Sequence, residues 1–197
     1  TFEEVLDIAK YVEGITGTRP AFLLAILQEE ATLTKKFGLC YVTNFNTGEG
    51  ARVVGGGRLP KTMHPKRDIP GFLSITKELG RDPLKTPVTC PMSFGWGGAM
   101  GPADFIPSTW MLHKDRLQKI IGKLPDPWNI RDGFLASGLY LSDSGAASKT
   151  RDGEWKAAML YFSDFPDLAN SPYSWYANDV LKIADKLEAD IETLEQK

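Results

Sequence analysis

The stretch from Phe22 to Leu33 constrains this chain most, because it places a carboxylate on the apolar face of a helix. It reads FLLAILQEEATL, and its large apolar residues recur at the spacing of an amphipathic helix. At about 100° per residue, Glu30 falls near the middle of the apolar stripe, Glu29 at its edge and Gln28 on the other side. The residues of the stripe are Leu23, Ile26 and Leu27.

Glu30 is a candidate general acid. A carboxylate directed at a protein interior costs free energy unless it is paired, reached by solvent from a cleft, or protonated. Apolar surroundings raise the pKa of a carboxyl group, and general acid catalysis near neutral pH needs such a raised pKa. The alternative is a wide helix on which Glu30 extends to solvent or bonds a neighbouring side chain.

Composition limits the classes of protein that fit. The chain has 197 residues, of which 42% are hydrophobic and 24% charged, which is ordinary for one soluble domain. The net charge is −2 and no basic run stands out, so we expect no nucleic-acid partner. No apolar run approaches the length of a membrane span. The chain does not begin with Met, so the lack of a signal peptide says nothing about export.

The two cysteines, Cys40 and Cys90, and the two histidines are isolated from one another in the sequence. This spacing does not favour a zinc site, and we expect no bound metal. A single pair of cysteines far apart suggests one disulfide and an oxidising compartment. Two buried free thiols are the alternative.

Helical spacing and helix-stop signals recur along the chain, so we expect a mainly helical fold with a small β element or irregular hairpin near residues 39–66. Gly14 is expected to end the first helix, Gly38 the second and Gly122 a later one. The charged residues 188–197 are expected to form a helical tail. Helices are predicted at about 2–13, 18–37, 68–80, 108–121, 129–142, 152–161 and from 174 onward.

A glycine-rich segment, residues 97–110, reads GGAMGPADFIPSTW. Gly97, Gly98 and Gly101 let the backbone approach another group closely, and Pro107 suits the first turn of the following helix. The pattern predicts either a groove lined by backbone or tight packing in the core.

This segment closely resembles the GAMGPAQFIPSTW-type signature of lytic transglycosylases with a lysozyme-like fold, in the branch that includes the membrane-bound transglycosylase B type. Glu30-Ala31-Thr32-Leu33 resembles the catalytic-glutamate segment of that family. Tyr161, which ends the run AAMLY, resembles its third motif. The stretch WYANDVL at residues 175–181 resembles the aromatic-led helix that closes the family's domain. The resemblance extends from about residue 18 to residue 187.

The resemblance implies one all-α, lysozyme-like domain over residues 1–197 that cleaves peptidoglycan glycan strands without a cofactor. Glu30 is implied as the general acid and base, and the substrate implies an extracytoplasmic location, where Cys40 and Cys90 become a plausible disulfide. We also expect a monomer. The residues expected to contact substrate are Trp96, Met100, Gly101, Asp104, Phe105, Tyr161 and Tyr176.

Three positions depart from the family pattern. Ala31 stands where the family usually has Ser, Asp104 where it has Gln, and Phe162 where some branches have Asn. Two rival functions therefore stay open: a lysozyme-type muramidase that uses Glu30 and Asp104, and a degenerate glycan-binding module.

Overall fold

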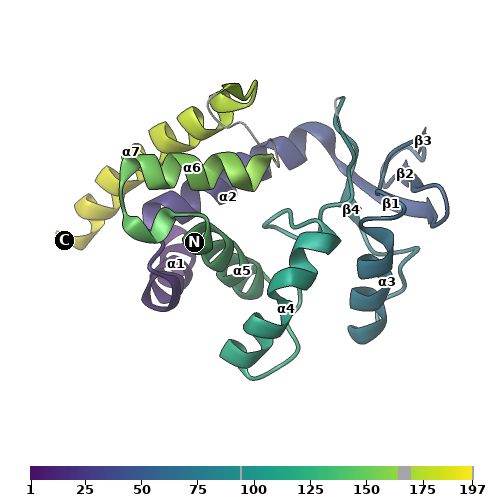
Figure 1. Ribbon diagram of the computed structural model, residues 1–197, viewed down its shortest axis with the longest axis horizontal. Helices are drawn as coiled ribbons and strands as arrows, with labels where there is room; N and C mark the ends of the chain where they lie inside the picture. Colours follow the sequence, from purple (N-terminus) through teal and green to yellow (C-terminus); the bar gives the residue numbers. More distant parts are fainter. Residues whose placement is uncertain (94, 164–169, 197) are drawn as a thin grey trace. The chain divides into compact units, whose positions relative to one another are not determined.

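The computed structural model describes residues 1–93, 95–163 and 170–196, which form seven α-helices and a small antiparallel sheet (Figure 1). The predicted fold class, mainly α with a small β insertion, is confirmed. The chain divides into two compact units, one made of Thr1–Glu29 with Phe134–Lys197 and the other of Glu30–Gly133. The assignment of one lysozyme-like domain to the whole chain stays a prediction.

The first unit is helical. α1 continues past Gly14 and ends at Gly17, whose φ of 77° is the left-handed conformation of a C-terminal cap. α6 begins at Arg151, one residue before the predicted start at about residue 152, because the Thr150 hydroxyl caps it by accepting the hydrogen bond from the Gly153 N–H. The unit contains α1 (Phe2–Thr16), the first part of α2 (Pro20–Phe37), most of α5 (Ile130–Asp143), the short 3₁₀ helix η1 (Ala146–Ser148), α6 (Arg151–Phe162) and α7 (Ser174–Glu195).

Buried polar contacts fix how these helices pack. The Thr18 hydroxyl, fully buried, donates to the Gly138 carbonyl on α5 at 2.9 Å. A side chain at Gly138 would collide with Val12 on α1, so α1 and α5 approach closely there. Arg19 donates to both oxygens of the buried Glu154 carboxylate at 2.9 Å and also pairs with Glu188, which ties the start of α2 to α6 and α7.

The second unit contains a four-stranded antiparallel sheet in the order β3-β2-β1-β4 (Figure 1). The predicted irregular hairpin is the pair β1 and β2, whose register shifts between Val42 and Asn44. The end of α2 also lies in this unit and stops at Gly38, as predicted, where φ is 81°. The remaining elements are β1 (Leu39–Asn44), β2 (Glu49–Arg52), β3 (Arg58–Leu59), α3 (Ile69–Glu78), β4 (Val88–Thr89) and α4 (Pro107–Ile121).

Cys40 and Cys90 form a disulfide in this sheet. Cys40 pairs with Val88 across the β1–β4 ladder, and Cys90 follows β4, so the two Cα atoms lie 5.0 Å apart. The alternative of two free thiols is wrong. A structural disulfide is compatible with an oxidising, extracytoplasmic compartment.

Asp68 joins α3 to α4. Its fully buried carboxylate accepts hydrogen bonds from the Arg67 guanidinium at 2.9 Å and from the Ser108 hydroxyl at 2.7 Å. Asp68 occupies the N-cap position of α3, at the predicted start of this helix, but its side chain makes no capping hydrogen bond. The carboxylate bonds the neighbouring helix instead of the free N–H groups of its own.

Over residues 1–93, 95–163 and 170–196, no helix is both long enough and apolar enough to span a membrane.

Candidate functional site

Glu30 is buried, with 8% of its surface exposed, on α2. The apolar stripe that predicted this burial is also buried: Leu23 and Ile26 expose no surface and Leu27 exposes 6%. Gln28 is exposed and Glu29 is half-buried, which matches the predicted faces of the helix. Burial, together with the negative charge of Asp179, raises the pKa of Glu29. Glu30 is nevertheless the better candidate, because it lies deeper on the same helix.

The glycine-rich segment folds into a tight turn between Met100 and Phe105. The Met100 N–H donates to the Phe105 carbonyl at 2.8 Å, and the Asp104 N–H donates to the Gly101 carbonyl at 3.3 Å. Gly101 has a φ of 67°, and a side chain there would collide with the Pro127 carbonyl oxygen. Asp104 has a φ of 51°, which only a few non-glycine residues adopt. The turn therefore holds the Asp104 side chain in one defined place.

The Asp104 carboxyl group is almost enclosed. Its Oδ2 accepts a hydrogen bond from the Thr34 hydroxyl, whereas its Oδ1 is buried and has no hydrogen-bond partner. Burial raises the pKa of Asp104 to about 6, although the hydrogen bond from Thr34 acts in the opposite direction. At neutral pH this residue is therefore close to its titration range.

Thr34 connects this carboxyl group to the candidate acid. Thr34 follows Glu30 by four residues on α2, so their side chains share one face, with about 5–6 Å between Cβ atoms. The hydrogen bond from Thr34 thus brings the turn at Asp104 to within one helical turn of Glu30. Sequence reasoning missed Thr34, although a hydroxyl four residues after a buried glutamate was a detectable signal.

The glycines before this turn approach the protein's own backbone. Gly97 is buried, and a Cβ atom there would lie 2.5 Å from the Thr89 carbonyl oxygen. The Gly98 N–H donates to that same oxygen at 2.9 Å. Of the two predicted alternatives, tight core packing is therefore the one that describes Gly97 and Gly98.

The aromatic and apolar candidates of this unit differ in exposure. Trp96 is half-buried beside His64, with ring centroids 4.8 Å apart, and retains a partly exposed surface. Met100 exposes none of its surface and Phe105 only 4%, and the Phe105 ring packs edge-on against Trp110. The side chains of Met100 and Phe105 therefore pack beneath the turn. Trp96 is the aromatic candidate of this unit whose partly exposed ring a ligand can contact.

Tyr161 and Tyr176 belong to the other unit. The Tyr161 hydroxyl lies 2.9 Å from Ser137 Oγ, and its ring meets Tyr140 edge-on at 5.4 Å. Tyr176 is fully buried and stacks on Phe162 with a centroid distance of 4.4 Å. Phe162, which departs from the family pattern, thus belongs to a cluster of aromatic rings that covers the buried Tyr176. Among the residues predicted to contact substrate, Trp96 and residues 100–105 lie in the same unit as Glu30. Tyr161 and Tyr176 do not.

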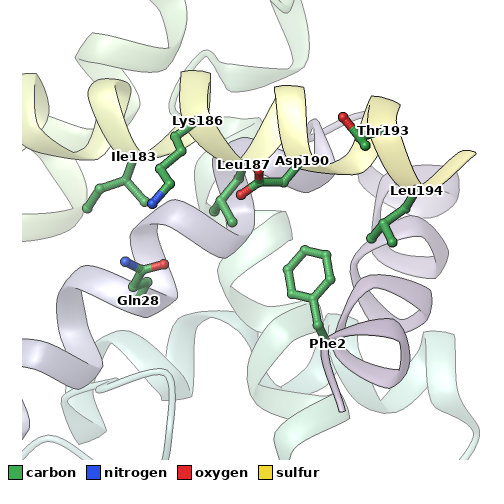
Figure 2. Close-up of a pocket in the computed structure, with 8 residues that line it drawn as sticks. All are labelled: Phe2, Gln28, Ile183, Lys186, Leu187, Asp190, Thr193 and Leu194. Atoms are coloured by element: carbon green, nitrogen blue, oxygen red, sulfur yellow. The ribbon is translucent and has the colours of Figure 1, made fainter.

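A depression of about 650 Å³ lies in the helical unit, and none of the predicted site residues lines it (Figure 2). Figure 2 shows the Phe2 ring below α7, facing apolar side chains of that helix, with Gln28 projecting from α2. The lining residues are Phe2, Gln28, Ile183, Lys186, Leu187, Asp190, Thr193 and Leu194. Its lining contains no pair of carboxylates.

Over the described part of the chain, no group of three or more His, Cys, Asp or Glu residues is arranged to hold a metal ion.

Comparison with models of protein families, with curated proteins and with solved structures finds no match to this chain.

Proposed function

We propose that this protein is a peptidoglycan lytic transglycosylase with a lysozyme-like domain and that Glu30 is its general acid and base. The observation that carries the proposal is the hydrogen bond between Thr34 and Asp104. It joins the two segments that resemble the family's motifs, the glutamate helix and the glycine-rich turn, at a buried carboxylic acid. Membership of the family rests on those motifs.

The proposed reaction cleaves the β-1,4 bond between N-acetylmuramic acid and N-acetylglucosamine. Glu30, protonated, donates its proton to the glycosidic oxygen as the bond from that oxygen to C1 of the muramic acid breaks. The N-acetyl group of this sugar stabilises the cationic centre. The ionised Glu30 then accepts the proton of the C6 hydroxyl group of the same sugar. As it does so, the oxygen of that hydroxyl group bonds to C1. A 1,6-anhydromuramoyl end forms, no water is consumed, and Glu30 regains its proton.

The surroundings of Asp104 favour this reaction over hydrolysis. A muramidase needs a second carboxylate that either activates a water molecule or bonds to the sugar. Here Asp104 Oδ1 is enclosed and Oδ2 is engaged by Thr34, so the carboxyl group presents no open oxygen to an incoming water. Glu30 acting twice needs no such group.

The substrate of this reaction lies outside the cytoplasm, and the Cys40–Cys90 disulfide fits that location. We therefore assign the protein to the periplasm or the cell wall, with peptidoglycan glycan strands as its partner.

The test is digestion of purified peptidoglycan followed by mass spectrometry. Anhydro products are lighter than hydrolytic products by one water molecule and take up no label from heavy-oxygen water. Reducing muramic acid ends that carry the label would instead identify a muramidase, and Asp104 would then be the second carboxylate to examine. Saturable binding to the glycan without any cleavage would identify a glycan-binding module.

A further inference from the structure

A second depression, of about 420 Å³, lies on the surface of α6 and α7 within the helical unit. It contains none of the residues assigned to the proposed reaction. It is lined by Arg151, Asp152 and Trp155 from α6 and by Asn178, Leu181 and Lys182 from α7.

Trp155 gives this depression a fixed aromatic face. Its indole Nε1–H donates to Asn178 Oδ1 at 3.0 Å, a bond that holds the ring between the two helices. The ring is half-buried, and Leu181, with 3% of its surface exposed, completes an apolar lining. Because the polar edge of the indole is already engaged by Asn178, the ring offers a ligand its apolar face.

The charged groups around this face are largely balanced. Arg151 donates to both carboxylate oxygens of Asp185 at 3.1 Å, and Lys182 pairs with Asp179 at 3.0 Å. Asp152 is exposed, and no side chain in the described part of the chain pairs with its carboxylate. The depression thus lacks the excess positive charge that recognition of a phosphate or a nucleic acid requires.

The other polar side chains that line the depression can form hydrogen bonds with hydroxyl and amide groups of a ligand. The Asp152 carboxylate is a pure acceptor, while Asn178 retains the two N–H donors of its amide and Arg151 has further N–H groups. A small number of donors and acceptors around one aromatic face is the composition of a site for a neutral polar ligand. A pyranose ring matches it, since one face of the ring presents C–H groups and its edge presents hydroxyls.

We infer that this depression is a saccharide-binding site for a neutral N-acetylhexosamine unit, stacked on Trp155 and hydrogen-bonded through Asp152 and Asn178. The site goes beyond the proposed reaction, because it uses other residues and requires no bond cleavage. A glycan strand repeats the same sugars many times, so a second site on the protein would retain it on the polymer by raising the effective concentration of substrate.

The experiment is a titration of the full chain, labelled with ¹⁵N, with tetra-N-acetylchitotetraose, followed by NMR. The chain has five tryptophans, and the indole signal of Trp155 is identified by its loss in Trp155→Phe. The Glu30→Gln variant is used as the background, so that no turnover of the probe occurs. We expect a saturable shift of the Trp155 indole signal and of the Asn178 side-chain amide signals at millimolar probe.

Two variants test the contacts. Trp155→Ala, followed through the Asn178 side-chain amide signals, should weaken binding of the probe at this site about tenfold, as loss of a stacked aromatic face predicts. Asp152→Asn alters an exposed side chain, so it keeps the site testable if Trp155→Ala fails to fold, and it should weaken binding several-fold. Trp175→Phe, which changes an exposed tryptophan on α7 outside the depression, is the matched control and should leave the Trp155 shift unchanged.

The result that overturns the inference is an unmoved Trp155 signal at saturating probe, or a shift that galacturonate oligomers produce and chitotetraose does not. The outcome is independent of the proposed reaction. Absence of cleavage by the wild-type protein, together with a persistent Trp155 shift, would refute the transglycosylase and leave the saccharide site standing. Cleavage with an unmoved Trp155 signal would do the reverse.

Discussion

The Thr34 hydroxyl donates a hydrogen bond to the Asp104 carboxylate across 70 residues of sequence. Thr34 lies one turn after the buried Glu30, and Asp104 stands in a turn with a φ of 51°. This contact ties a second titratable carboxyl group to the helix that carries the candidate acid, one turn after it, and the first predictions concern this group of residues.

Glu30→Gln should lower the cleavage rate by at least about a hundredfold while the protein remains folded. Glutamine has nearly the same shape but cannot donate and recover a proton. Glu29→Gln on the same helix is the matched control and should stay within a few-fold of the wild type. Turnover of a soluble glycan fragment, with circular dichroism to check folding, measures both. Near wild-type turnover by Glu30→Gln would contradict the assignment.

Thr34→Val should destabilise the protein by roughly 1–3 kcal/mol, because it leaves a nearly enclosed carboxyl group without its hydrogen-bond partner. It should also raise the pKa of Asp104 further, since the bond from Thr34 lowers it. Denaturant unfolding and carboxyl ¹³C NMR measure the two effects. Thr34→Ser, which keeps the hydroxyl, is the matched control and should show neither effect, and equal effects in both variants would argue against the hydrogen bond.

Asp104 should make the protein less stable as the pH rises. Its pKa is raised by burial from 3.8 to about 6, so the folded state holds a proton that the unfolded state has already lost. The favourable contribution is complete below about pH 4 and is lost between about pH 4 and 6, at a cost of roughly 3 kcal/mol. Asp104→Asn, which tolerates a positive φ, should remove this part of the pH dependence. Unfolding free energies measured from pH 4 to 7 check it, and parallel curves for the two proteins would exclude it.

Asp104→Gln restores the residue found in the family pattern and should raise or retune the cleavage activity. An amide donates and accepts hydrogen bonds, whereas a carboxylate only accepts them. Removing a titratable group near Glu30 should also shift the acidic limb of the pH–rate profile. Rate, product pattern and pH profile are the readouts, and if all three stay unchanged, Asp104 does not face the substrate.

Reduction of the Cys40–Cys90 disulfide should lower the melting temperature but leave catalysis intact. The bond closes a loop with a sequence separation of 50, which corresponds to about 4 kcal/mol in the chain-entropy model. Calorimetry with and without a reductant measures the change. The double variant Cys40→Ser/Cys90→Ser should be insensitive to the reductant, and labelling that finds two free thiols in the untreated protein would contradict the bond.

The sequence by itself determined the helix that carries Glu30 and the face on which that residue lies. The period of the apolar residues gives the buried stripe, and Gly38 and Gly122 end their helices because the chain needs a left-handed residue there. These are local properties, set within a few residues along the chain. The same local rules failed at Gly14, where helix α1 continues to Thr16, since a glycine weakens a helix without having to end it.

Only the tertiary structure decided which distant groups meet. It paired Thr34 with Asp104 and turned the Asp68 carboxylate toward Ser108 instead of its own helix end. It also buried Tyr176 against Phe162, although the sequence had placed Tyr176 among the residues expected to contact the sugar substrate. A buried polar or aromatic group takes whichever partner the packing brings within reach, and the spacing of residues along one element does not encode that choice.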